Sequence, residues 1–224
     1  NTLGVTDIHP IPIASLKSQI TAVLSDIGSD SVKIGMLHNA EAIVAVEEVL
    51  SKFEIKNSVL DPVMVATSGN TLLENEAIDT LKKVLIPKAR SITANKPEAE
   101  IFLGEKINSQ EDLLKVADKL AELYQVSVLL KAGHLKDDEL IDVLYNAETD
   151  EIKEFKSKRI YSKNTHGTGC TLSSALAAFI AKGYDLNTSV QKAKDYINEA
   201  IIAGADYTIG KGHGPVHHFY KFWK

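Results

Sequence analysis

The chain has 224 residues, of which 44% are hydrophobic and 25% charged, with a formal net charge of −5. A chain of this length can bury one substantial core, so we expect one α/β domain over residues 1–224 rather than two. The net negative charge and the lack of a basic block argue against a nucleic-acid partner. The longest apolar run is too short to span a membrane. The single cysteine favours a reducing compartment, so the expected location is the cytoplasm.

Short β-branched runs alternate along the chain with longer segments of helical period. This alternation predicts an α/β fold with a mostly parallel central sheet and helices on both faces. In chain order, the expected elements are a helix over 13–27, a strand over 31–34, a helix over 40–53, a strand over 58–60, a helix over 74–85, a strand over 91–93, a helix over 109–124, a strand over 126–130, strands over 140–145 and 151–156, and helices over 169–182 and 188–205. Gly28 is expected to end the first helix, and Ser109 with Asp112 resembles a capping box at the start of the fourth. The last two strands flank a polar turn, which predicts an antiparallel hairpin at one edge of the sheet.

Ligands of open α/β sheets bind outside the carboxyl ends of the strands, so the residues that follow each strand are the first candidates for a site. Four such segments follow apolar β-branched runs: Gly35-Met36, Asp61 to Met64, Asn95 to Glu98, and Lys131 to His134. A fifth segment, Asn164 to Thr171, opens a helix. These five segments are the candidate site.

The fifth segment carries the most informative pattern, Gly167-Thr168-Gly169-Cys170. Two glycines let the backbone approach a ligand closely, and a helix start presents unpaired N–H groups with a partial positive charge, so the pattern indicates an anion site. Cys170 lies in the expected first turn, where the thiolate form of a cysteine is favoured, and could act as a base or an electrostatic partner. Taken alone, the pattern is more often a glycine-rich turn with a small buried cysteine.

Phosphoryl transfer at such a site would need further charged groups, because the chain has no G-x-x-x-x-G-K-[ST] loop and no Rossmann glycine pattern. Asp61 and Glu98 could contact Mg²⁺ through water, since Mg²⁺ keeps several of its waters, and Lys131 could bind a phosphate. Each also has a structural interpretation: a strand-ending turn for Asp61, a favoured helix N-terminus for Glu98 and a solvated side chain for Lys131.

Other candidates have structural interpretations as well. Met36 is more often a core residue than part of a ligand wall, and Asn95 could be a helix cap. Three histidines near the end of the sequence, at positions 213, 217 and 218, lack acidic or cysteine partners, so no metal site is predicted there.

Together these segments resemble the hydroxymethylpyrimidine/phosphomethylpyrimidine kinase branch of the ribokinase superfamily, over essentially the whole chain. The run Asn-Thr-His-Gly-Thr-Gly-Cys-Thr is highly specific, and the Asp-Pro-Val-Met and Asn-x-x-Glu runs are moderately so. The matching blocks occur in the order of the family: Asn1 to Val5, Val32 to Leu37, Asp61 to Ala66, Asn95 to Glu100, Lys131 to Leu135, Asn164 to Thr171, and Gly212 to Phe219.

The resemblance implies a ribokinase-like kinase that uses ATP and Mg²⁺. Its substrate would be the pyrimidine alcohol 4-amino-5-hydroxymethyl-2-methylpyrimidine, phosphorylated on its hydroxymethyl group, and then the resulting monophosphate, in thiamine biosynthesis. By the matching blocks, Gly167, Thr168 and Gly169 would form the anion hole for the γ-phosphate. Cys170 would take the place that aspartate holds in most ribokinase relatives.

The resemblance also implies roles for the remaining candidates around this hole. Asp61 and Glu98 would organise Mg²⁺ and phosphate, and Met36 would line the pyrimidine pocket. The residues on the nucleotide side would be Asn95, Lys131, Thr165 and His166. The expected assembly is a homodimer.

Two departures from the family pattern affect these expectations. The family normally begins with a strand and a Gly/Ser-rich substrate loop, including a glutamine immediately before the position of Asn1, so the first βα unit is expected to be missing from this chain. Thr67 stands where the family usually has lysine, and Ala132 where it usually has glycine.

Two alternatives stay open: a cysteine-type pyridoxal or pyridoxine kinase, and an inactive nucleotide-binding fragment.

Overall fold

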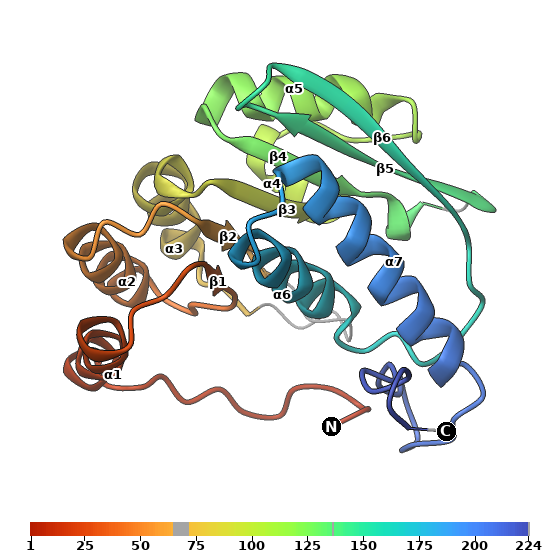
Figure 1. Ribbon diagram of the computed structural model, residues 1–224, viewed down its shortest axis with the longest axis horizontal. Coiled ribbons are helices and arrows are strands. Elements are labelled where there is room, and N and C mark those ends of the chain that lie inside the picture. The colour runs from red at the N-terminus through yellow and green to blue at the C-terminus, as the bar shows by residue number, and fades with distance from the viewer. Residues whose placement is uncertain (65–71, 136, 224) are drawn as a thin grey trace.

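The computed structural model describes residues 1–64, 72–135 and 137–223, and within them six strands form one sheet (Figure 1). The strands follow one another across the sheet in chain order: β1 (Val32–Ile34), β2 (Ser58–Leu60), β3 (Ser91–Asn95), β4 (Ser127–Lys131), β5 (Glu139–Asn146) and β6 (Glu151–Lys158). Strands β1 to β4 are parallel, whereas β5 pairs antiparallel with both β4 and β6. The mostly parallel sheet with an antiparallel edge hairpin is therefore confirmed.

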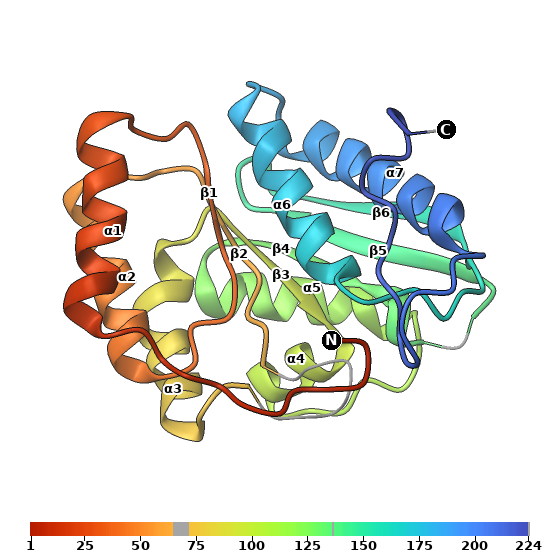
Figure 2. The same ribbon diagram turned by 90° about the horizontal axis from the view of Figure 1, so that it is seen from below.

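Helices cover both faces of this sheet, as the sequence pattern predicts. They are α1 (Ile13–Asp26), α2 (Ala40–Lys52), α3 (Asn75–Thr80), α4 (Lys96–Leu103), α5 (Asp112–Tyr124), α6 (Thr168–Ala181) and α7 (Leu186–Gly204). Helices α6 and α7 lie on one face, whereas α2, α4 and α5 lie on the other, with α1 packed outside α2 (Figures 1 and 2).

The central strands send consecutive residues to opposite faces. Val59 packs in the core beneath α6 and α7, whereas Leu60 packs in the core beneath α2, α4 and α5. Leu129 and Leu130 divide in the same way in β4. Strands buried on both faces must be apolar almost throughout, so the strand ends are where polar side chains can gather.

Local residues set several helix ends where the sequence places them. Asn39 and Asp185 each accept a backbone N–H in the first turn of the helix that follows, α2 and α7 respectively. Each thereby satisfies one of the unpaired donors of a helix start. Gly28 follows α1 with a φ of 77°, a left-handed conformation that glycine adopts without strain, and it ends the helix as predicted.

Three segments differ from the expected elements. The helix expected over 109–124 begins only at Asp112. The Asp112 carboxylate accepts the Ser109 N–H at 3.0 Å, but no side chain caps the first turn of the helix. Only half of the expected capping box therefore forms. The helix expected over 74–85 is an α-helix only over Asn75–Thr80 and continues as a wider π-helical turn over Leu81–Leu85. Helix α4, for which the sequence marked only a start, follows β3 directly.

An extended arm over residues 1–12 runs from α1 toward the C-terminal segment (Figures 1 and 2). There the Thr2 carbonyl accepts the His213 N–H (3.0 Å), and the Thr2 hydroxyl accepts the Gly212 N–H (3.2 Å). A Cβ at Gly212 would lie 2.0 Å from the Thr2 carbonyl oxygen, so only glycine allows this approach.

None of the helices in the described part of the chain is long and apolar enough to cross a membrane.

Candidate active site

Asp61 is the centre of a polar cluster at the carboxyl end of β2. Its side chain is only 3% exposed, yet both of its oxygens accept hydrogen bonds. Oδ1 accepts the Thr93 hydroxyl and the Lys131 ammonium, each at 3.0 Å, and Oδ2 accepts the Ser173 hydroxyl at 3.0 Å. Three elements, β3, β4 and α6, therefore meet at one buried carboxylate.

Burial alone would raise the pKa of Asp61, but the charge and hydrogen bond of Lys131, with Lys33 and Thr93, hold it below its ordinary value. Lys131 shows the reverse balance: burial would lower its pKa, and the Asp61 and Glu98 carboxylates raise it. The cluster is therefore charged at neutral pH, with a carboxylate and an ammonium in contact. A strand-ending turn does not by itself explain Asp61, because its buried carboxylate binds the Lys131 ammonium. For the same reason Lys131 is not a solvated side chain.

Glu98 lies close to the same cluster, and burial raises its pKa, against the lowering effects of Lys131 and of the Asn95 N–H. Its Oε2 accepts that N–H at 2.8 Å, while the Asn95 Oδ1 accepts the Glu98 N–H at 3.0 Å. The two residues thus form a capping box at the start of α4, which confirms the helix-cap interpretation of Asn95. The charges of Lys131 and Asp61 both affect the Glu98 carboxyl group, so it belongs to the same electrostatic environment.

The raised pKa of Glu98 predicts a pH dependence of stability. The native state binds a proton at Glu98 more tightly than the unfolded chain, whose value is near 4.5, so stability should fall as pH rises from about 4.5 through the native pKa. Glu98→Gln keeps an oxygen for the Asn95 N–H but cannot titrate, and it should flatten this part of the profile. Urea unfolding at several pH values between about 4.5 and 8 measures the slope; an equal slope in both proteins contradicts the prediction.

Helix α6 points its first turn at this cluster. Gly167 precedes the helix with a φ of 82°, and a Cβ built on Gly169 would lie 3.6 Å from the Lys131 Nζ and 4.0 Å from the Asp61 Oδ2. The helix start therefore lies close to the Lys131 ammonium, and Gly169 presents only a hydrogen to it. Backbone N–H groups and an ammonium around one space make a site for an anion.

Gly169→Ala should test that space without unfolding the helix. The added methyl makes only ordinary contacts, and alanine is a better helix former by about 1 kcal/mol, so stability should not fall. The methyl would nevertheless lie between the α6 start and Lys131, and we expect the KM for ATP, the phosphoryl donor that the family resemblance implies, to rise about tenfold or more, because each 1.4 kcal/mol of lost phosphate binding is a factor of ten. Steady-state kinetics and thermal unfolding measure the two effects; an unchanged KM in a folded variant would place the anion elsewhere.

Cys170 is exposed in the first turn of α6, and its charge is among the influences that raise the pKa of Lys131. The thiol is therefore open to solvent, and its neighbour in the chain, Gly169, faces the Lys131 ammonium. The interpretation of this motif as a turn with a small buried cysteine is wrong. The Thr168 hydroxyl donates to the Thr165 carbonyl at 3.1 Å, and the Thr168 N–H donates to the same oxygen at 3.4 Å.

Three other predicted site residues, Met36, Thr165 and His166, are not among the hydrogen-bond partners of Asp61. Met36 is 39% exposed beyond the end of β1, which contradicts the core interpretation. Thr165 is half-buried and His166 exposed. The His166 N–H donates to the Gly214 carbonyl at 3.0 Å, so this part of the loop is tied to the C-terminal segment. Thr67 lies outside the described residues.

Three members of the cluster were not anticipated from the sequence. Thr93 and Ser173 donate to Asp61, and the Lys33 Nζ lies 3.9 Å from the Asp61 Oδ2. A signal for each exists: Lys33 and Thr93 interrupt short buried apolar strands, and Ser173 follows Gly169 by one helical turn. Polar residues at such positions need partners, and here the partner is one carboxylate.

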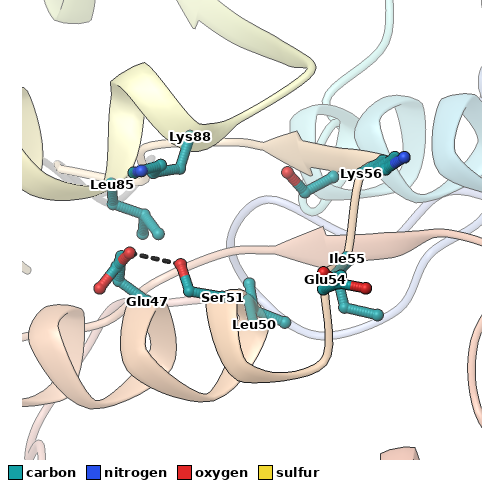
Figure 3. A pocket seen from close by; sticks show the side chains of 9 residues that line it. Glu47, Leu50, Ser51, Glu54, Ile55, Lys56, Leu85 and Lys88 are labelled. Carbon is teal, nitrogen blue, oxygen red and sulfur yellow. Dashed lines mark hydrogen bonds between the residues drawn. The ribbon is translucent and has the colours of Figure 1, made fainter.

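A pocket of about 230 Å³ opens at the opposite end of β2 (Figure 3). Its lining includes Glu47, Leu50, Leu85 and Lys88, and the Glu47 carboxylate accepts the Ser51 hydroxyl at 2.6 Å. The pocket is smaller than usual ligand sites of roughly 300–1,000 Å³ and lies away from the carboxyl ends of the strands. The polar cluster around Asp61 is therefore a better candidate for an active site than this pocket.

The sequence matches the family model described as phosphomethylpyrimidine kinase over residues 1–217. This chain belongs to the phosphomethylpyrimidine kinase family. The hydroxymethylpyrimidine/phosphomethylpyrimidine kinase of Rhizobium meliloti is 41% identical over 225 residues, which cover 100% of this chain and 84% of that protein. A bifunctional thiamine biosynthesis protein of Geobacter sulfurreducens is 44% identical over 97% of this chain, which spans 44% of that longer protein.

Solved structures of the family and its neighbours share the fold. A phosphomethylpyrimidine kinase from Clostridium difficile superposes with a TM-score of 0.78 at 40% identity, covering 90% of this chain and 81% of that one. A pyridoxal kinase from Bacillus subtilis, solved as an ADP complex, superposes with a TM-score of 0.87 at 31% identity, covering 96% and 80%. The ribokinase-like fold expected for a phosphomethylpyrimidine kinase is confirmed.

Proposed function

We propose that the chain phosphorylates 4-amino-5-hydroxymethyl-2-methylpyrimidine and then its monophosphate with ATP, in thiamine biosynthesis. The observation that carries the proposal is the start of α6, where Gly169 faces Lys131 beside the buried Asp61. Family membership and the names of the relatives support the pyrimidine substrate and the pathway. Solved relatives in complex with ADP, or with AMP-PCP and pyridoxal, support nucleotide use.

In the proposed reaction, the hydroxymethyl oxygen of the pyrimidine bonds to the γ-phosphorus of ATP while the bond from that phosphorus to the β–γ bridging oxygen breaks. ADP leaves, and the hydroxyl proton passes to the Cys170 thiolate. The N–H groups of Gly167, Thr168 and Gly169 hold the charge of the transferring group, and Lys131 balances it from the opposite side. Preorganised donors of this kind need no rearrangement during the step.

Mg²⁺ would accompany the nucleotide and neutralise charge on its phosphates. The donor set fits this ion, because Mg²⁺ binds through one or two carboxylates and keeps several waters. Both Asp61 oxygens already accept protein hydrogen bonds, so Asp61 would act through water, as would Glu98. We assign Asn95, Thr165 and His166 to the border of the nucleotide site and Met36 to the pyrimidine pocket.

The direct test is turnover by the full-length protein with ATP, Mg²⁺ and the hydroxymethyl pyrimidine, followed by mass spectrometry of the mono- and diphosphate products. We expect both products in sequence. ADP binding by calorimetry serves as the control for a competent nucleotide site. Tight ADP binding with neither product would exclude the kinase assignment and favour the nucleotide-binding module.

Pyridoxal phosphorylation is the second candidate, because the Bacillus subtilis pyridoxal kinase shares the fold with a TM-score of 0.87. A competition assay with equal concentrations of the pyrimidine alcohol and pyridoxal separates the two. We expect the pyrimidine to have the higher kcat/KM. A preference for pyridoxal reverses the substrate assignment but leaves the phosphoryl-transfer proposal intact.

The homodimer and the cytoplasmic location expected from the sequence stay predictions. Analytical ultracentrifugation of the full-length protein tests the first. Fractionation of cells that produce the protein tests the second.

A further inference from the structure

A buried ion pair outside the Asp61 cluster joins α7 to the edge of the sheet. The Lys194 Nζ donates to the Asp142 Oδ2 at 2.7 Å and to the Phe155 carbonyl at 2.6 Å. The two charged side chains are 4% and 14% exposed. Lys194 lies on the apolar face of α7, between Ala193 and Ile197, which belong to the core beneath that helix. A full charge at this depth requires an explanation.

The other oxygen of the same carboxylate holds the loop that carries Lys131. Asp142 Oδ1 accepts the Ala132 N–H at 2.8 Å. The ladder between β4 and β5 ends at the pair Leu130 and Val143, so the next position brings Lys131 opposite Asp142. Here the chain leaves β4 for the short helical turn Ala132–His134, and the Asp142 side chain supplies the acceptor that the ladder no longer provides.

Stability alone does not account for this arrangement. A buried ion pair is often matched or exceeded in stability by apolar residues of similar volume, because desolvation offsets the attraction of the charges. What an apolar pair cannot do is accept the Ala132 N–H and fix the backbone from which Lys131 extends. Ala132 is fully buried, so without Asp142 its N–H would have no access to water.

We propose that Asp142 is a positioning residue for Lys131: its carboxylate accepts the Ala132 N–H and thereby holds the phosphate-binding lysine, and Lys194 neutralises the buried charge of that carboxylate. The inference rests on the proposed role of Lys131 at the nucleotide. It links α7, through two side chains, to the anion site at the start of α6. Among the residues that the structure describes, neither side chain forms a hydrogen bond or ion pair with the Asp61 cluster, and Asp142 acts through the backbone at residues 131 and 132.

Two double variants separate positioning from mere packing. Asp142→Asn with Lys194→Met removes both charges but keeps an amide oxygen for the Ala132 N–H. Asp142→Leu with Lys194→Met also removes both charges but offers no acceptor. We expect the first to bind ADP like the wild type and the second to show an ADP Kd and an ATP KM raised about tenfold or more, with kcat less affected. Calorimetry measures ADP binding independently of turnover, so the test stands even if the proposed substrate is wrong.

Equal ADP affinity in the two folded double variants, whether high or low, overturns the proposal. Near-UV circular dichroism and thermal unfolding establish that each is folded. Should the leucine variant fail to fold, Asp142→Ala with Lys194→Met makes the same comparison with less bulk in the core. An inactive wild type that still binds ADP would refute the proposed function and leave this positioning test unaffected.

Discussion

Cys170→Ala should lower kcat by about 10²- to 10³-fold, the usual contribution of a positioned proton acceptor, while the Kd for ADP changes little. Cys170 lies in the exposed first turn of α6, near enough to Lys131 for its charge to affect that lysine. The groups that would bind the nucleotide phosphates, the α6 backbone and Lys131, are unchanged by the substitution. The loss of activity should therefore appear in kcat, which reports the chemical step, rather than in the Kd for ADP.

Two further variants define that result. Ser174→Ala, one turn later on the same helix and also exposed, should leave kcat and the ADP Kd unchanged. Cys170→Asp should retain more turnover than Cys170→Ala, because a carboxylate can also accept the proton. Single-turnover kinetics and calorimetry give the two quantities. A parallel loss of kcat and ADP affinity in Cys170→Ala would show that the thiol supports the fold of the loop instead.

The order of elements could be predicted from the sequence because each strand is an apolar run and each helix an amphipathic one. The hairpin over β5 and β6 was visible as two runs around a polar turn, and β1 to β4 as short runs between helices. Boundaries were less certain where propensity and capping disagree. The Asp112 carboxylate accepts the Ser109 N–H, but the helix begins only at Asp112 because no side chain caps an earlier start.

The candidate site was predicted as separate segments, and the fold explains why they meet. Asp61, Asn95 and Lys131 each follow or end a parallel strand, so their side chains share one edge of the sheet. Lys33 and Thr93 escaped prediction because a polar residue inside an apolar strand signals that it needs a partner but does not reveal which residue the partner is. The ion pair of Asp142 and Lys194 joins positions 52 residues apart through antiparallel pairing and helix packing, which no local pattern encodes.

Lys131→Met should be the most destabilising single change in the cluster. It leaves Asp61 and Glu98 buried without their nearest cation, and removing one partner of a buried ion pair costs about 3–5 kcal/mol. Asp61→Asn removes the other partner and should also destabilise the protein. The double variant should cost less than the sum of the two, by about 1–3 kcal/mol, because neither charge is then left alone.

Urea unfolding of the wild type, both single variants and the double variant measures this coupling, provided that the m-value is the same in all four. The exposed pair of Lys119 and Glu105, with an Nζ to Oε2 distance of 2.7 Å, is the matched control. Lys119→Met should cost less than about 1 kcal/mol, because solvent screens that pair. Strict additivity of Lys131→Met and Asp61→Asn would mean that the two side chains do not interact in solution, and the anion site built on their contact would then lose its foundation.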